Sequence, residues 1–453
     1  MASKVYSMET DGRSHSAATG LVQQMVTVFE AAGFAEMIKP GDAVAIKLHC
    51  GEWNNTAYLR PVYARTLADR IKALGGRPFV CDTTTQTYST MSSRASALDL
   101  LITAERNGYT SATLGCPFIV ADGFNGTDDL RVDLPEGYIL KEAYIAKAIA
   151  LADAMIVLTH FKGHPLGIIG GSIKNLGIGA QSKRGKMNVH MGGHPRYGLG
   201  PATDFHPERC KGRNGCDRWE ECEGSCPYGL FHVTNDSIEW DRELCVNCLA
   251  HLGANTWCGV TNRAQLNAQA SCAAMADACL ATVKTVGRDK VGFINMAIDV
   301  SPFCDCIPFA DMPIVPQLGV FAGRDPVALD KVSVDKAAAA PGVPGSAAED
   351  YDASAPGAIK FSPVAGRNFD DISEEIQLVT GSLNGLGSLD YELVTVEPVA
   401  DERLWRFPDL RTMRDKFGRL YAKEDPFPRD RHGGRGYLRE DGVDMDAVTG
   451  AGT

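Results

Sequence analysis

Short apolar runs alternate with amphipathic helical segments along most of this chain. The runs GDAVAIKLH and RPFVCDT predict buried strands, and LRPVYARTLADRIKALGG between them predicts an amphipathic helix. Strands joined by helices of this length pair in parallel, because a parallel pair needs a long crossover connection. The alternation therefore predicts an α/β fold in which a mostly parallel sheet has helices on both faces.

The same pattern continues on both sides of a cysteine-rich interruption. Further strands are predicted in PFIVAD, AMIVLTHF, VGFINMAIDV and QLGVFAG, and further helices in SSRASALDLLITAERNG, KEAYIAKAIALAD, the segment from about Arg263, and DPVALDKVSVDKAAA. The last of these helices has Asp325 at its N-cap and Pro326 in its first turn. We expect an α/β domain over 1–200 and 259–396, an insert over 201–258, and a charged C-terminal tail over 397–453.

The interruption is a dense group of cysteines. Seven of the 14 cysteines lie between Cys210 and Cys258. The start MASKVYSMETDGRS has no apolar segment of signal-peptide length, so we expect a cytoplasmic protein, in which clustered cysteines indicate metal ligands or redox groups before disulfides. Cys222-x3-Cys226, followed by proline, and Cys245-x2-Cys248 resemble the two halves of a bacterial two-cluster ferredoxin. One 4Fe–4S cluster is expected and a second is possible; zinc or one degenerate cluster is the alternative.

The crossed pairing of two-cluster ferredoxins divides the ligands into two sets. The first set is Cys210, Cys216, Cys222 and Cys258. The second set is Cys226, Cys245 and Cys248, and it lacks one ligand because His251 stands where a ferredoxin has a cysteine. His251 could complete the set, a distant cysteine could do so, or one iron could stay open to substrate. The pair Cys304 and Cys306 could lend that ligand or could sit in a polar turn.

Charge and hydropathy limit the partners. The net charge of −11 argues against a nucleic-acid or membrane-surface binder, because phosphate binding needs a positive field. No run of 18 apolar residues is present, so no membrane span is predicted. A homo-oligomer is left open.

Four phrases occur in order and resemble the family called domain of unknown function 362. They are IKLHCGEWNNTAYLRP, THFKGHPLGIIGGSIKNLGIG, the cysteine block, and SPFCDCIPFADMPIVPQLGVFAGRDPVALD. The resemblance spans about 4–396 and implies a cytoplasmic α/β protein with a ferredoxin-type 4Fe–4S insert. It implies no particular reaction. The cysteine spacing is wider than the usual insert. GGSIKNLGIG is also weakly similar to a Gly-Gly-x-Lys loop of lactate-racemase-like proteins, and that similarity carries over no nickel cofactor.

Three polar loops follow predicted strand ends, where α/β sheets place their sites. Histidines with lysines beside them can transfer protons and stabilise charge, and the candidate catalytic residues are His49, His160, Lys162, His164 and Lys174. Glycines let a backbone approach a ligand, and a helix starting there would present free amides to an anion. The candidate substrate-binding residues are Lys47, Asn55, Thr56, Arg60, Asp82, Gly170, Gly171 and Asn175. The basic stretch SKRGKMNVHMGGHPR either lines the same cleft or is a charged connector.

Three functions fit these features. The first is an iron–sulfur oxidoreductase that passes electrons from a ferredoxin-like or other donor protein to a small organic, anionic substrate in the α/β cleft. The second is a non-redox lyase or hydratase in which an open cluster iron acts as a Lewis acid. The third is an electron carrier or binding protein without chemistry of its own. No GxGxxG fingerprint follows an early strand, which favours a separate donor over bound NADH and leaves a flavin open.

Overall fold

The protein is described here by a computed structural model that covers residues 2–8, 17–86, 92–198, 200, 202–246, 251, 258–398, 410–426, 430–440 and 442–450. The chain divides into two compact units, Met1–Val399 and Ala400–Thr453. The first unit contains the α/β sheet and the cysteine-rich segment. The second contains α15 (Leu410–Lys423) and α16 (Met445–Thr449).

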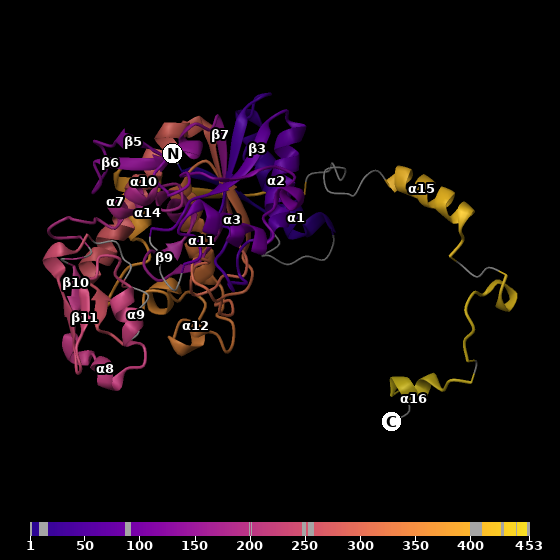
Figure 1. Ribbon diagram of the computed structural model, residues 1–453. Helices are drawn as coiled ribbons and strands as arrows, with labels where there is room; N and C mark the ends of the chain where they lie inside the picture. Colours follow the sequence, from indigo (N-terminus) through magenta and orange to yellow (C-terminus); the bar gives the residue numbers. More distant parts are fainter. Residues whose placement is uncertain are drawn as a thin grey trace. The chain divides into compact units, whose positions relative to one another are not determined.

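An eight-stranded sheet forms the centre of the first unit (Figure 1), in the order β16-β1-β15-β14-β7-β2-β3-β4. Within it, β15 is antiparallel to both of its neighbours, and all the other neighbouring pairs are parallel. The predicted mostly parallel sheet is therefore confirmed. The strands are β1 (Ser3–Ser7), β2 (Ala43–Lys47), β3 (Arg77–Asp82), β4 (Phe118–Val120), β7 (Ala154–His160), β14 (Val291–Ala297), β15 (Gly319–Gly323) and β16 (Tyr391–Thr395).

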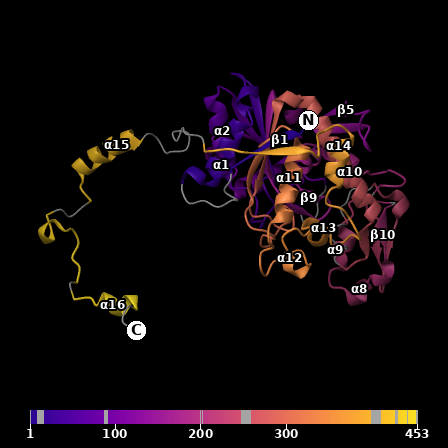
Figure 2. The same cartoon turned by 180° about the vertical axis from the view of Figure 1, so that it is seen from behind.

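Helices cover both faces of this sheet. On one face, the largest hydrophobic core joins inward side chains of the strands to α6 (Ser172–Gly177), α10 (Gln265–Val286), α11 (Pro326–Ala339) and α14 (Ile376–Leu383). On the other face, which receives the alternate side chains of each strand, lie α1 (Leu21–Ala31), α2 (Pro61–Ala73) and α3 (Ala97–Arg106). Figure 2 shows β1 and the helices around it from behind. The Asp325 carboxylate caps α11 by accepting from the amides of Val327 and Ala328, as the sequence predicts.

One predicted helix is wrong. The segment KEAYIAKAIALAD forms β6 (Glu142–Ala146), which pairs antiparallel with β5 (Asp129–Asp133), and only a short helix, α5 (Lys147–Ala150), follows. The reason lies in burial with a period of two: Ala143 and Ile145 enter the main core while Tyr144 between them is less buried. That period belongs to a strand, although each residue tolerates a helix.

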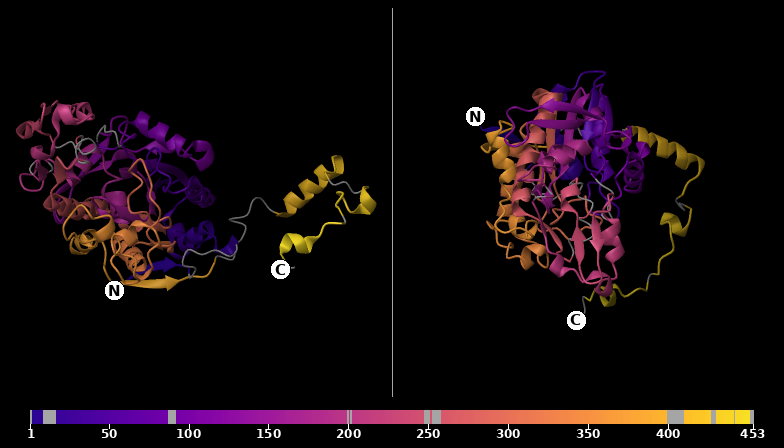
Figure 3. Two further views of the ribbon diagram at one scale, coloured as in Figure 1. Left: turned by 90° about the horizontal axis from the view of Figure 1, so that it is seen from below. Right: turned by 60° about the vertical axis from the view of Figure 1, so that its left-hand side comes forward.

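The cysteine-rich segment has a small core of its own. It is entered through β10 (Thr203–Phe205) and left through β13 (Thr261–Arg263), which pair antiparallel. Between them lie α8 (Gly212–Gly215), α9 (Trp219–Gly224) and a hairpin of β11 (Phe231–Val233) and β12 (Ile238–Trp240). Four cysteines pack against the apolar residues of this hairpin. The segment projects beside the sheet as a separate lobe (Figure 3).

The remaining short elements complete the chain. They are α4 (Ser111–Leu114), β8 (Lys162–His164), β9 (Ile168–Gly170), α7 (Lys183–Val189), α12 (Ala347–Asp350) and α13 (Phe361–Val364). Among the described residues, no helix combines the length and apolarity that crossing a bilayer requires.

Candidate functional site

A cavity of about 230 Å³ lies where β2, β3 and β7 end. These strands are parallel neighbours, so residues at their carboxyl ends converge on one edge of the sheet. The cavity brings together ten of the predicted site residues: Lys47, His49, Asp82, His160, Lys162, His164, Gly170, Gly171, Lys174 and Asn175. It also receives Cys306 and, from the basic stretch that follows α6, Lys186 and His190.

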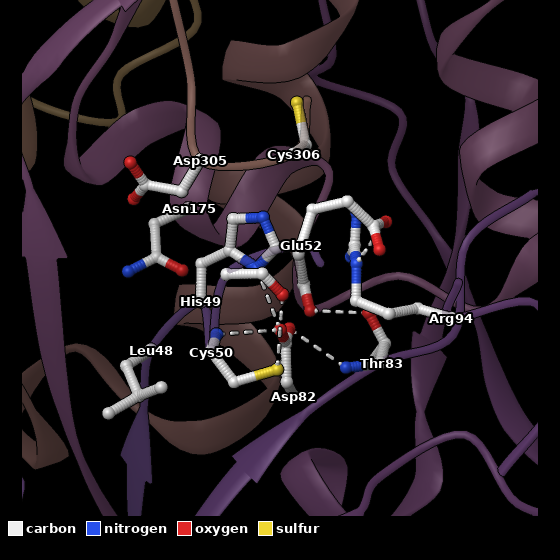
Figure 4. Close-up of polar contacts among 12 residues, drawn as sticks. Leu48, His49, Cys50, Glu52, Asp82, Thr83, Arg94, Asn175, Asp305 and Cys306 are labelled. Atoms are coloured by element: carbon white, nitrogen blue, oxygen red, sulfur yellow. Dashed lines mark hydrogen bonds and ion pairs between the residues drawn. The ribbon is translucent and has the colours of Figure 1, made fainter. Parts of the chain in front are cut away.

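Asp82 organises one wall of the cavity (Figure 4). Its buried carboxylate accepts from Lys47 Nζ at 3.0 Å, from His49 Nδ1 at 3.0 Å and from the amides of Cys50 and Thr83. Burial acts to raise the pKa of Asp82, but the Lys47 charge and the His49 hydrogen bond outweigh it and hold the pKa well below its usual value. Asp82 is therefore an ionised anchor that fixes Lys47 and His49.

His49 presents a free nitrogen to the cavity. Because Asp82 only accepts, His49 Nδ1 carries the proton, and Nε2 is left as a lone-pair acceptor. That Nε2 is buried and has no hydrogen-bond partner among the described residues. Burial, followed by the charge of Arg94, lowers the pKa of His49 to about 4, so the ring is neutral near pH 7. Such an atom can accept a proton from a bound molecule or coordinate a metal.

Lys174 supplies a positive charge that nothing in the described chain neutralises. It projects from α6, lines the cavity, and makes no hydrogen bond or ion pair with the described residues. Burial, followed by the charges of Lys162 and Arg94, lowers its pKa to about 7. By contrast, Lys47 is paired with Asp82, and Arg94 is paired with Glu52 at 3.0 Å. An anion in the cavity would stabilise the charged form of Lys174.

His160 and Lys162 are occupied by an acidic partner. Asp305 accepts from His160 Nδ1 at 2.9 Å and from Lys162 Nζ at 3.1 Å. The other His160 nitrogen faces the carbonyl oxygens of Ile298 and Asp299. No nitrogen of this ring is free for proton transfer, so the geometry favours a positioning role, and the catalytic role of His160 stays a prediction.

The glycine loop before α6 serves the fold in a way that the sequence does not indicate. The amides of Ser172 and Ile173 donate to the buried carboxylate of Asp330 from α11, at 2.8 and 2.9 Å. A Cβ added at Gly171 would lie 2.4 Å from that carboxylate. The interpretation that these amides are free for an anion is therefore wrong, because Asp330 already occupies them. Gly170 and Gly171 themselves still line the cavity.

Three predicted substrate ligands lie outside the cavity lining. Asn55 is buried and donates through Nδ2 to the carbonyls of Ile307 and Phe309, at 3.1 and 2.8 Å. Arg60 pairs with Asp299, and its side chain is 59% exposed. Thr56 is exposed. Asn175 does line the cavity, where its amide links Lys47 to Thr159.

Two groups of side chains at or behind the cavity wall could hold a metal ion. The ligand atoms of His49, Cys50 and Asp82 lie within 4.8 Å of one another, and those of His164, Cys304 and Cys306 do so as well. Cys304 and Cys306 form a disulfide. In the second group, His164 Nδ1 already accepts from the amides of Leu166 and Gly167, so its proton sits on Nε2, 3.9 Å from Cys306 Sγ.

The first predicted set of cluster ligands converges in the insert. Cys222 lies close enough to Cys258, Cys216 and Cys210 for their charges to interact, and burial together with these neighbours raises its pKa to about 11. The four predicted ligands of the first set therefore lie near one another in the insert.

The second predicted set surrounds a small cavity in the same lobe. Cys226, Cys245 and His251 all line it, together with Phe231 and Trp240. His251 Nε2 is buried without a hydrogen-bond partner among the described residues. Burial, followed by the charges of Arg263 and Arg242, lowers the pKa of His251 to about 4. A neutral, unpartnered imidazole beside two thiols fits a metal ligand. Cys248, the other predicted member, lies outside the described residues.

Arg263 connects this lobe to the α/β cavity. It is half-buried at the end of β13, its Nη2 lies 3.4 Å from His190 Nδ1, and His190 lines the cavity. Its charge acts on the pKa of both His251 and His164. Arg263 is therefore close to both ligand-bearing regions.

Two charged residues of the site were not predicted from the sequence. Arg94 lines the cavity and forms a buried pair with Glu52, and Asp305 holds His160 and Lys162. Arg94 follows a polar stretch without periodicity, so no pattern indicates its burial. Asp305 could have been predicted from the sequence, because an acidic residue between two cysteines in an apolar context needs a buried cation.

These features define a class: an α/β protein whose cationic strand-end cavity adjoins a lobe with two groups of potential metal ligands. A family model described as "Domain of unknown function (DUF362)" matches residues 44–335, and the chain belongs to this family. The comparison with curated proteins gives no match.

Among solved structures, the chain is similar to the lactate racemase apoprotein from Thermoanaerobacterium thermosaccharolyticum, with 12% identity and a TM-score of 0.31. The match covers 66% of this chain and about half, 51%, of that structure. At that score the similarity carries no argument about the site.

Proposed function

We propose that the chain is an iron–sulfur oxidoreductase that passes electrons from a ferredoxin-type donor through one or two 4Fe–4S clusters in the insert to a small organic anion in the α/β cavity. The observation that carries the proposal is that Arg263, at the end of the strand that leaves the lobe, lies 3.4 Å from His190 of the cavity that holds Lys174. When bound, the clusters supply one-electron redox chemistry. A cytoplasmic location and a protein electron donor are part of the same proposal.

In this proposal the cavity residues bind the anion, transfer a proton and stabilise charge. Lys174 binds the anion, because it is the cavity lysine without a partner among the described residues. His49 Nε2 accepts or returns a proton, and Asp82 keeps the ring in the tautomer that this transfer requires. Lys47 and Lys162 are held by carboxylates and contribute a positive field.

The ligand set supports two clusters in the insert. Cys210, Cys216, Cys222 and Cys258 would hold the first, and Cys226, Cys245, Cys248 and His251 the second. His251 fits that position because its free nitrogen lies with two thiols around one small cavity. With this position filled, the ligand set leaves no site for an open iron, which favours electron transfer over Lewis-acid hydration.

Anaerobic iron and sulfide analysis with EPR tests the proposal directly. We expect about eight irons per chain and signals from two clusters after reduction. In His251→Ala, one of the two signals should disappear or change while the other persists. His232→Ala is the matched control, because His232 is exposed on β11 in the same lobe and pairs with the exposed residue Asp241. A colourless protein that contains zinc would contradict the proposal.

A further inference from the structure

The loop between β14 and β15 carries two bonded sulfurs to the wall of the cavity. Cys304 and Cys306 are joined by a disulfide across a single residue. Cys304 is fully buried, and Cys306 is half-buried and lines the cavity that holds His49 and Lys174. One sulfur therefore faces whatever binds there, and the other is shielded behind it.

Asp305, the residue between the two cysteines, is held in place by the side chains that it pairs with. Asp305 is fully buried and accepts from His160 at 2.9 Å and from Lys162 at 3.1 Å, so the strand end that carries these residues holds the middle of the loop. Asn55 holds the next part by donating to the carbonyls of Ile307 and Phe309. His160, Lys162 and Asn55, which the sequence predicts to act on a substrate, therefore hold the loop that carries the two sulfurs.

His164 directs a protonated nitrogen, Nε2, toward Cys306 of the disulfide, and its lone pair on Nδ1 is used elsewhere. Its Nδ1 accepts from the amides of Leu166 and Gly167, at 3.1 and 2.8 Å, so the neutral ring is protonated at Nε2. That Nε2 lies 3.9 Å from Cys306 Sγ. A protonated nitrogen can stabilise a thiolate or give it a proton, but it cannot coordinate a metal ion without losing that proton.

Arg263, at the end of the lobe, acts on the same ring through its charge. Arg263 lies 3.4 Å from His190, and its charge reaches both His164 in the cavity and His251 in the lobe. The disulfide, His164, Arg263 and His251 all belong to the first unit, and Arg263 lies near enough to both histidines for its charge to act on them.

We propose that Cys304 and Cys306 form a redox-active dithiol/disulfide pair that collects electrons singly and delivers them to the cavity two at a time. The inference rests on the proposed function, whose ferredoxin-class donor is the reductant. Two electrons and two protons break the sulfur–sulfur bond and give two thiols. Re-forming that bond releases two electrons and two protons, so the substrate class is an anion that accepts both electrons in one step.

Cysteine labelling of the full chain tests the pair without an activity assay. Anaerobic protein is treated with titanium(III) citrate, a one-electron reductant without thiols, quenched in acid, alkylated in denaturant, and mapped by mass spectrometry. We expect Cys304 and Cys306 to be alkylated only after the reductant is added. Cys116, a buried free thiol outside the cavity lining, is the internal control and should be alkylated in every sample.

A substitution at a predicted cluster ligand tests whether electrons reach the Cys304–Cys306 disulfide through the lobe. In Cys226→Ala, titanium(III) should leave Cys304 and Cys306 largely unalkylated, whereas the phosphine TCEP, a two-electron reductant, should still reduce them fully. Cys116→Ala is the matched substitution and should leave the titanium(III) result unchanged. Equal reduction by titanium(III) in wild type and Cys226→Ala would overturn the link to the lobe.

The remaining outcomes distinguish this inference from the proposed function. If iron analysis and EPR show reduced clusters while Cys304 and Cys306 stay bonded, the inference fails and the proposed function stands. If no iron is found, the proposed function fails, and the inference loses its electron source with it. One zinc per chain that the TCEP-reduced protein retains and Cys306→Ala loses would assign a metal site to these sulfurs and overturn the redox role.

Discussion

At the scale of single residues, the cavity is organised by which charges have partners. Asp82 and Asp305 each neutralise a lysine and orient a histidine, at distances of 2.9–3.1 Å. Lys174 has no such partner among the described residues, and the lone pair of His49 Nε2 is also free. A cation and a base without partners in one cavity are what an anionic substrate with a transferable proton requires.

The lowered pKa of Lys174 gives a pH-dependent reactivity. Since its pKa is about 7, the amine is protonated and able to bind an anion below that pH, and it is a neutral nucleophile above it. We expect labelling of Lys174 by acetic anhydride, followed by peptide mapping, to rise with a midpoint near pH 7. An ordinary exposed lysine should label with a midpoint near pH 10.4. A Lys174 midpoint above pH 9 would contradict this.

The Asp82 anchor has a large predicted effect on stability. Asp82→Asn removes the charge that neutralises buried Lys47, and we expect a loss of about 3 kcal/mol in the free energy of unfolding, measured with urea. Asp69→Asn is the control, because its pair with Arg65 is on the surface, with side chains about half exposed, and should cost less than about 1 kcal/mol. Equal losses in the two variants would refute the buried-anchor role.

At the scale of elements, α6 is held to α11 by a single carboxylate. Asp330 accepts the amides of Ser172 and Ile173 and also the side-chain amide of Asn295 on β14. Three elements therefore meet at one buried acid, and α6 places Lys174 at the cavity through that contact. Burial raises the pKa of Asp330 to about 6, and the hydrogen bonds that it accepts limit the rise.

A substitution at Gly171, the residue before α6, is expected to disrupt the contact between α6 and Asp330 of α11. A Cβ at Gly171 would lie 2.4 Å from the Asp330 carboxylate, so Gly171→Ala should displace Asp330 and cost about 2 kcal/mol of unfolding free energy in urea. Gly224→Ala at the end of α9 is the control, since a Cβ there meets nothing within 4 Å, and it should leave stability unchanged. Unchanged stability in Gly171→Ala would show that the junction tolerates more volume.

At the scale of the whole molecule, the first unit contains every element of the sheet and both ligand-bearing regions. Its last strand, β16, pairs with β1 at the sheet edge and ends at Thr395. The second unit begins at Ala400 and has its own short helices. The sheet, the cavity and the cysteine lobe are therefore complete without the second unit.

Removing the second unit should leave the first intact. A chain ending at residue 398 keeps β16 and all the residues of both cavities, so we expect the same urea midpoint and the same iron content as the full chain. A chain ending at residue 388 loses β16 and exposes β1 as an unpaired edge, so it should be clearly less stable. A lower midpoint for the longer of these two chains would contradict the division into units.

Some parts of the fold and site follow from sequence patterns, and others do not. Apolar runs and caps predict most strands and helices, because burial and hydrogen bonding act locally on a period of two or 3.6 residues. Asp325 at the start of α11 is an example. The segment that forms β6 is not predicted in this way, because its strand depends on pairing with β5, which local propensity does not encode.

The sequence by itself determined the α/β class and the family resemblance, because these depend on residue identity and spacing along the chain. Only the tertiary structure decided which polar groups are free. In it, His160 pairs with Asp305, the amides of Ser172 and Ile173 donate to Asp330, and Lys174 and His49 Nε2 have no partner among the described residues. Partners such as these are brought together across more than a hundred residues, and a buried charge is satisfied by whatever the fold places beside it, not by its neighbours in sequence.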